Sequence, residues 1–292
     1  LLIQGKDSTG LITILGVFVA ATFRMIPSLN RIIAATQSMK YYRPSVDIIY
    51  KEIKDNIGLL VDDIKLKEFD FKNDIEFLSV DFNFTKGLDI LKGINLKIKK
   101  GQTIGIIGES GSGKSTLVDL LIGLHKPTSG EIIIDGINGF QMSQSWRKKI
   151  GYVSQTIYLT DDTIKKNIAL GLPENNIDDT RVIELLKQVQ LEKFINNLEL
   201  GMNTKVGERG VQLSGGQRQR IGIARALYNS PEILILDEAT SALDDKTEKE
   251  IIKTINDLKG DKTIIMIAHR ISTLKNCEKI YEIENKKLKS RN

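Results

Sequence analysis

Apolar residues follow three different patterns along this chain. Near the N-terminus, residues 11–23 are almost continuously apolar, and a helical spacing of apolar residues follows over 29–42 and again from 46 to about 54. Pro27 and Pro44 separate these stretches, and proline interrupts helices. We therefore predict three helical segments, followed by a charged, irregular linker over residues 56–74.

After this linker, the pattern changes to strands and then to alternating strands and helices. Residues 75–84 alternate apolar and polar side chains, and the turn at Lys86 and Gly87 leads to a second such run, which predicts an antiparallel pair. Continuous β-branched runs are typical of strands buried on both faces. The predicted strands are 75–84, 90–98, 103–107, 131–134, 233–236 and 263–267. The predicted helices are 163–170, 179–189, 214–227 and 246–258. This alternation indicates a mostly parallel sheet wrapped by helices.

Composition narrows the class of protein only slightly. The chain has 292 residues, 41% of them hydrophobic and 27% charged, which is typical of globular domains. Its net charge of +5 is compatible with binding to nucleic acid, with binding to an anionic lipid surface, and with neither of these. A single cysteine excludes an intramolecular disulfide. Because the first residue is leucine, we expect a fragment or a processed product.

The N-terminal apolar run leaves three alternatives open. Residues 11–23 fall short of the ~18 residues expected of a spanning helix, and Arg24 follows them directly. An arginine inside a membrane is costly unless it faces protein or water. The run is therefore a buried soluble helix, an amphipathic surface segment or the last membrane helix of a longer protein.

The strand over residues 103–107 runs into a phosphate-binding motif. Residues 108–115 fit the P-loop pattern G-x-x-x-x-G-K-[ST], and a helix can begin directly after them. Glycines let backbone N–H groups turn toward an anion at the positive end of a helix. The predicted nucleotide-binding residues here are Gly108, Glu109, Ser110, Gly111, Ser112, Gly113, Lys114, Ser115 and Thr116. We expect Lys114 to bind the β- and γ-phosphates of ATP and Ser115 to bind Mg²⁺.

Two acidic residues end another buried strand. Asp237 and Glu238 follow the apolar residues 233–236. In P-loop enzymes, the first acid at such a strand end supports Mg²⁺. Glu238, one residue further, is placed to act as general base toward an attacking water.

A second candidate anion site lies much later in the chain. Residues 213–217 place a serine and two glycines at the start of a predicted helix, and the predicted binding residues are Ser214, Gly215, Gly216 and Gln217. Because the chain has a single copy of each anion site, we infer that one ATP is bound between two chains, by the P-loop of one and the second site of the other. We therefore predict a head-to-tail dimer that closes on ATP.

The sequence Leu-Ser-Gly-Gly-Gln at 213–217, with its flanks 206–210 and 218–220, resembles the signature of ATP-binding cassette (ABC) transporters. The resemblance extends over roughly residues 71–284 and implies further site residues. It implies adenine stacking on Phe84, where the family usually has tyrosine. Gln155 is similar to the glutamine that senses Mg²⁺ and the attacking water, and His269 to the histidine that contacts the γ-phosphate. Ser241, Ala242, Leu243 and Asp244 resemble the loop at the dimer interface.

The resemblance implies a hydrolysing cassette: an α/β P-loop NTPase with a mostly parallel core sheet, an antiparallel β subdomain and a helical subdomain over about 156–228. The loop 204–210 resembles one found in exporters, whose membrane domain is fused N-terminal to the cassette. The expected organisation is the end of a transmembrane helix over 1–26, a helical extension and linker over 27–70, and the nucleotide-binding domain over 71–292. In the complete chain, we expect the cassette on the cytoplasmic side of an inner or plasma membrane.

The expected partners are a second copy or a homologous cassette, a transmembrane domain in the same full-length chain, and membrane lipid. Residues 23–32 also resemble the end of the last helix in flippases of lipid-linked oligosaccharides and in polysaccharide exporters. The alternatives within transport are exporters of peptides, lipid A or drugs. An alternative of another class is a soluble ABC ATPase that acts on DNA. Such proteins carry long coiled coils or zinc modules, whose sequence patterns are missing here, so no nucleic acid is expected.

Overall fold

The computed structural model describes residues 8–61, 70–84, 87–139, 143–240, 243, 245–268 and 270–291. The chain divides into two units, Leu1–Leu66 and Lys67–Asn292. The described part of the first unit is a single helix, α1, over Ser8–Val61.

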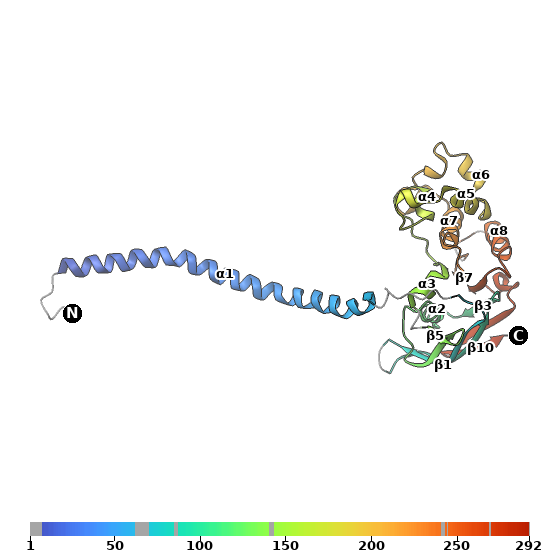
Figure 1. The fold of residues 1–292 in the computed structure, drawn as a ribbon, viewed down its shortest axis with the longest axis horizontal. Coiled ribbons are helices and arrows are strands. Elements are labelled where there is room, and N and C mark those ends of the chain that lie inside the picture. Colours follow the sequence, from blue (N-terminus) through green and yellow to red (C-terminus); the bar gives the residue numbers. More distant parts are fainter. Residues whose placement is uncertain are drawn as a thin grey trace. The chain divides into compact units, whose positions relative to one another are not determined.

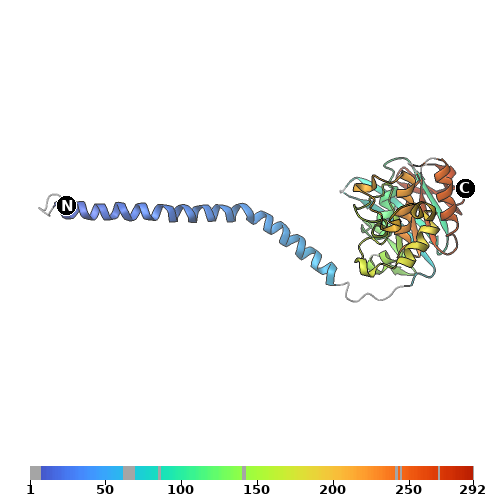
Figure 2. The ribbon, with the colours of Figure 1, turned by 90° about the horizontal axis from the view of Figure 1, so that it is seen from above.

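Helix α1 corrects the prediction of three helical segments. It continues through Pro27 and Pro44 over 54 residues and bends in its second half (Figure 2). A proline removes one backbone hydrogen bond, and the turns on either side keep theirs, so a long helix bends instead of ending. The predicted start of the linker at residue 56 is also wrong, because the helix runs on to Val61.

The second unit contains two sheets. An antiparallel sheet has the order β2-β1-β4-β5, and a six-stranded sheet has the order β10-β9-β3-β8-β7-β6. Strands β9, β3, β8, β7 and β6 are parallel, and β10 pairs antiparallel with β9 at the edge. The strands are β1 Asp74–Asn83, β2 Asp89–Lys99, β3 Thr103–Gly108, β4 Ser129–Ile134, β5 Ile137–Asn138, β6 Ile150–Val153, β7 Ile233–Asp237, β8 Thr263–Ile267, β9 Lys279–Glu284 and β10 Lys287–Arg291. The predicted α/β class with a mostly parallel core sheet is confirmed.

Helices lie between and around these sheets. In Figure 1, α4, α5 and α6 gather at one end of the second unit, and β1, β5 and β10 lie at the other. The helices are α2 Lys114–Ile122, α3 Ser143–Lys148, α4 Ile164–Ile168, α5 Asp179–Gln188, α6 Glu192–Asn196, α7 Gly215–Leu227 and α8 Asp245–Asn256. Short 3₁₀ turns occur at Glu174–Asn176, Gly201–Asn203, Glu208–Gly210 and Ile271–Leu274.

Strands β7 and β8 separate two hydrophobic cores. Leu234 and Leu236 face one core together with residues of α4, α5 and α7. Ile233 and Ile235 face the other core, which contains the antiparallel sheet and α2. Successive side chains of a strand point to opposite faces, so a strand covered on both faces is apolar throughout. This double coverage fixes the strand ends, and the acids that follow them, in a rigid setting.

Candidate functional site

The P-loop connects β3 to α2 through glycines in conformations that other residues rarely adopt. Gly111 has φ 77° and Gly113 has φ 103°. A Cβ on Gly113 would lie 2.8 Å from Cδ2 of Leu91 on β2. Glycine is therefore required at this position for two reasons, its backbone angle and its close packing. Helix α2 begins at the next residue, Lys114, so its first N–H groups border the loop.

The polar groups of this loop fit an anionic ligand. Lys114 is only 5% exposed, and its Nζ donates to the carbonyl oxygens of Gly108 at 2.9 Å and Glu109 at 2.8 Å. The Oγ of Ser112 is buried and has no hydrogen-bond partner among the described residues. A buried ammonium and an unsatisfied hydroxyl beside a helix N-terminus are the donors that phosphate oxygens need.

Asp237 lies next to this loop and binds residues from two other elements. Its Oδ2 accepts from the Oγ of Ser115 at 3.4 Å and from the hydroxyl of Tyr152, on β6, at 3.0 Å. Burial raises the pKa of the Asp237 carboxyl above its usual value, although the Tyr152 hydrogen bond opposes this shift. Burial also raises the pKa of Tyr152, so its phenol remains a donor. The carboxylate and the Ser115 hydroxyl are hard oxygen ligands of the kind that Mg²⁺ prefers.

Glu238, the residue after Asp237, forms a separate hydrogen-bonded pair with Gln155. Its Oε2 accepts from the Nε2 of Gln155 at 2.6 Å. Its backbone N–H donates to the carbonyl oxygen of Ile267 on β8 at 2.9 Å, and its φ is 49°. Non-glycine residues in this left-handed region are uncommon and cluster at functional sites. The structure therefore brings together Ser115 with Asp237 and Gln155 with Glu238 at the end of β7.

Ser214 caps helix α7. Its Oγ accepts from the N–H of Gln217 at 3.2 Å, and Oε1 of Gln217 accepts from the N–H of Ser214 at 2.8 Å. This reciprocal capping box fixes the start of the helix. Since the Ser214 hydroxyl acts only as an acceptor in the contacts of the described residues, it keeps its own hydrogen for another partner. Ser214 and Gly215 are both exposed, so this end of α7 presents donors at the surface.

Phe84 belongs to a group of three rings. It is 62% exposed, and its ring lies 4.9 Å from that of Phe82 and 5.3 Å from that of His125, edge to face in both cases. His125 lies in the turn after α2, where it is half-buried and its imidazole stacks on Phe82 at 5.3 Å. Two neighbouring rings thus hold the Phe84 side chain in place and leave much of it exposed.

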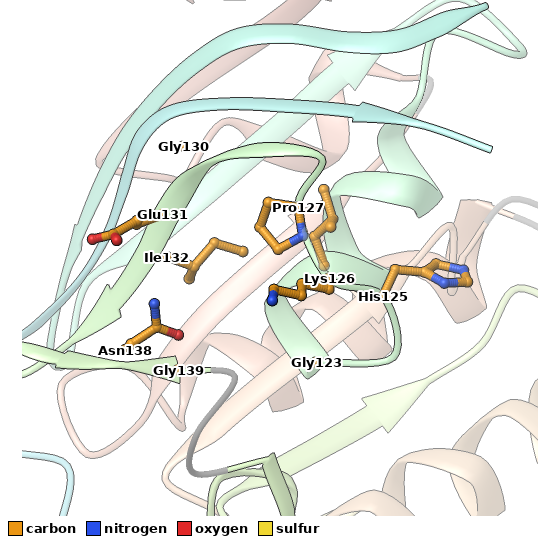
Figure 3. A pocket seen from close by; sticks show the side chains of 10 residues that line it. Gly123, His125, Lys126, Pro127, Gly130, Glu131, Ile132, Asn138 and Gly139 are labelled. Carbon is orange, nitrogen blue, oxygen red and sulfur yellow. The ribbon is translucent and has the colours of Figure 1, made fainter. Parts of the chain in front are cut away.

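A small cavity lies at the end of α2, next to this turn. It measures about 50 Å³ and is lined by residues of the turn and of β4 and β5, including Lys126, Pro127, Ile132 and Asn138. Figure 3 shows the His125 imidazole pointing away from Asn138 and Ile132. Ligand pockets usually measure about 300–1,000 Å³, so this cavity is too small for a nucleotide.

Some predicted residues lie outside the described residues. These are His269, Ser241, Ala242 and Asp244. In contrast, no sequence motif predicts a role for Tyr152, although its hydroxyl donates to Asp237. Tyr152 reaches Asp237 because β6 pairs in parallel with β7, and no local sequence motif predicts this pairing. A polar tip on an otherwise apolar strand is the one signal that points to it.

The two glycines of the signature have different surroundings, and this predicts different effects on stability. A Cβ on Gly215 would meet no atom within 4 Å, whereas a Cβ on Gly216 would lie 2.6 Å from Cγ2 of Thr247 on α8. Overpacking costs about 1–3 kcal/mol. In urea unfolding, we expect Gly216→Ala to be less stable than Gly215→Ala by this amount.

The matched control is the double variant Gly216→Ala with Thr247→Ser, which removes the clashing methyl group and keeps the hydroxyl. It should recover most of the lost stability. Equal stability of the two alanine variants would show that α8 does not press on Gly216.

Comparisons with known proteins agree with this geometry. Residues 91–241 match the family model described as ABC transporter. Putative multidrug export ATP-binding/permease proteins of Staphylococcus aureus strains NCTC 8325 and bovine RF122 are each 45% identical to the chain, over 236 and 237 residues respectively. Each match spans 80% of this chain and 39% of the relative.

A solved structure of a bacterial Atm1-family ABC exporter with ATP bound is similar at a TM-score of 0.69 and 38% identity, covering 74% of this chain and 38% of that one. The fold, the motifs and these matches agree. The chain belongs to the ABC transporter family and contains the ATP-binding domain of an exporter-type member, which is an ATP hydrolase.

Proposed function

We propose that this chain uses ATP binding and hydrolysis to drive export across the plasma membrane, by closing head to tail with a second cassette. The observation that carries this proposal is the pair of adjacent contacts at the end of β7. One joins Ser115 to Asp237 at 3.4 Å, and the other joins Gln155 to Glu238 at 2.6 Å. The oxygens of the first contact are suitable ligands for a metal ion, and the groups of the second are suitable to bind a water molecule.

In this proposal, Glu238 accepts a proton from the water that attacks the γ-phosphorus, and Gln155 orients both the water and Glu238. Lys114 and the loop N–H groups hold the phosphates, while Phe84 stacks on adenine. Ser115, Asp237 and Gln155 would hold Mg²⁺, which would neutralise charge on the phosphate oxygens. His269 contacts the γ-phosphate.

The second cassette completes the site. Ser214, Gly215, Gly216 and Gln217 of one chain approach the ATP held by the P-loop of the other. Support comes from the exposed start of α7, where the Ser214 hydroxyl retains a hydrogen to donate. Each closed dimer then encloses two ATP molecules, and hydrolysis reopens it.

The properties of helix α1 support the proposal that the protein is bound to a membrane. Residues Gly10–Lys54 are long and apolar enough to cross a membrane, with a mean hydropathy of 1.8 in the most apolar window, which has no buried residues in the structure. Large apolar side chains such as Phe18 and Phe23 are about 70% exposed, which is costly in water and favourable in lipid. We place the part up to residue 26 in the membrane and the cassette on its cytoplasmic side.

For the substrate, we propose an amphipathic or lipid-linked molecule. The relatives named as multidrug exporters support an amphipathic one. The run 23–32, with its resemblance to flippases, supports a lipid-linked one. Arg24 is then suited to an anionic headgroup that passes along α1.

The test uses the full-length protein reconstituted in liposomes. ATP hydrolysis is measured with amphipathic drugs, with lipid-linked sugars and with double-stranded DNA. Stimulation by either of the first two, together with ATP-dependent movement of that compound across the bilayer, supports the proposal. Stimulation by DNA alone, from a protein that does not remain with the liposomes, would overturn it.

A further inference from the structure

Helix α8 carries a carboxylate that binds three residues from two separate segments. The Oε1 of Glu248 accepts from the Oγ1 of Thr240 at 3.1 Å and from the Oγ1 of Thr273 at 2.7 Å. Its Oε2 lies 3.4 Å from Nη1 of Arg270. The Glu248 carboxylate thus joins α8 to two segments that are far apart in the sequence.

These three partners flank the residues proposed to act on the γ-phosphate. Thr240 lies two residues after Glu238, in the segment that leaves β7. Arg270 directly follows His269, and Thr273 lies in the 3₁₀ turn Ile271–Leu274. Because β7 and β8 are adjacent parallel strands, with Asp237 paired to Ile267, both segments leave the sheet at the same edge. The Glu248 carboxylate joins them just beyond that edge.

Burial makes the contacts to the two threonines stronger than the contact to arginine. The Glu248 side chain is 13% exposed, and Thr240 and Thr273 are each 7% exposed. A largely buried carboxylate depends on its hydrogen bonds, and charge-assisted bonds are short and strong. The Arg270 side chain is 56% exposed, on a groove along α8, so water weakens its ion pair. The two hydroxyls share Oε1, so a shift of one segment disturbs the hydrogen bond of the other.

A nearby glutamate on the same helix lacks these contacts. Glu250 pairs with Arg220 of α7 at 2.6 Å, and its side chain is 43% exposed. This pair joins two helices and contacts neither strand end in the interactions described. The two glutamates carry the same charge and lie on the same helix, but they differ in exposure and in partners.

We propose that Glu248 is a positioning residue for ATP hydrolysis, which holds the segment after Glu238 and the segment that carries His269 at a fixed separation. It touches neither the nucleotide nor the attacking water. Its effect is on the chemical step, because a small displacement of either segment moves the base or the γ-phosphate contact out of place. This inference rests on the roles proposed above for Glu238 and His269.

The test compares substitutions that remove or keep the shared acceptor, in the full chain in detergent micelles. Glu248→Ala loses both threonine contacts, and we expect kcat to fall by up to about 100-fold. Glu248→Gln keeps an amide oxygen for both hydroxyls and should retain most of kcat. The dissociation constant for a fluorescent ATP analogue should stay at the wild-type value in both variants.

Two controls separate positioning from general stability. Glu250→Gln should lower the unfolding temperature through its lost ion pair and leave kcat unchanged. Thr273→Val removes one hydroxyl with little change in volume, and its effect on kcat should be less than additive with that of Glu248→Ala. If Glu248→Ala does not fold, Thr273→Val alone tests the proposal. The kcat of Thr273→Val should fall, and its affinity for nucleotide should stay unchanged.

Wild-type kcat in a folded Glu248→Ala or Thr273→Val variant would overturn the inference, as would an equal loss of kcat in Glu250→Gln. Failure of the proposed function is distinguishable. In that case Glu238→Gln would itself retain hydrolysis, whatever Glu248 does.

Discussion

Replacement of Glu238 by glutamine is expected to abolish ATP turnover and to leave ATP binding intact. The amide has no basic oxygen for a proton, but its carbonyl oxygen still accepts the Gln155 hydrogen bond that measures 2.6 Å in the native protein. General acid–base groups contribute about 100- to 10,000-fold to rate, so kcat should fall by that factor. Phosphate release at saturating ATP gives kcat, and a fluorescent nucleotide gives the dissociation constant.

The same variant should accumulate as a dimer in the presence of ATP and Mg²⁺, because ATP is bound but not consumed. Gel filtration with and without ATP measures this. Glu184→Gln is the matched control, since Glu184 is 62% exposed in its side chain and pairs only with the neighbouring helical residue Arg181 in the contacts described. It should behave as the wild type. A wild-type rate in Glu238→Gln would remove Glu238 from the base role.

Replacement of Lys114 by alanine is expected to weaken ATP binding itself. The Lys114 ammonium is buried and bonded to the carbonyl oxygens of Gly108 and Glu109, so it is fixed in the centre of the loop. A hydrogen bond to a charged group contributes about 1.5–3 kcal/mol, which corresponds to about a 10- to 150-fold change in affinity. Isothermal titration with ATP measures the loss.

Thermal unfolding provides an independent measurement. ATP stabilises the wild type in proportion to its saturation, and Lys114→Ala should lose most of this stabilisation. Lys114→Arg keeps the charge but presents a planar fork in place of a compact ammonium, so it should restore little. Unchanged affinity in Lys114→Ala would show that the loop binds phosphate without its lysine.

The elements best predicted from sequence are those whose signal is local. The P-loop follows a buried strand and precedes a helix, and its glycines are required by backbone angle, as Gly113 shows. The serine at the start of α7 signals a cap by itself, and its glutamine partner lies three residues on. Each of these features is decided by fewer than ten consecutive residues, so pattern and structure agree.

The features that sequence did not predict depend on distant parts of the chain. Tyr152 reaches Asp237 because β6 pairs with β7, and Glu248 reaches Thr240 and Thr273 because α8 lies against both strand ends. His125 joins an aromatic group through contacts with β1. In α1 the local rule for proline was misleading, because the stability of the flanking turns outweighs one missing hydrogen bond.

The unbroken course of α1 has a mechanical consequence. An α-helix rises about 1.5 Å per residue, so its 54 residues measure roughly 80 Å along the axis. The hydrocarbon layer of a membrane is only about 30 Å thick, so a helix of this length that crossed it would extend beyond it over more than half of its length. Although α1 bends, its backbone stays helical from Ser8 to Val61, so a movement at one end is passed to the other more directly than flexible hinges at Pro27 and Pro44 would allow.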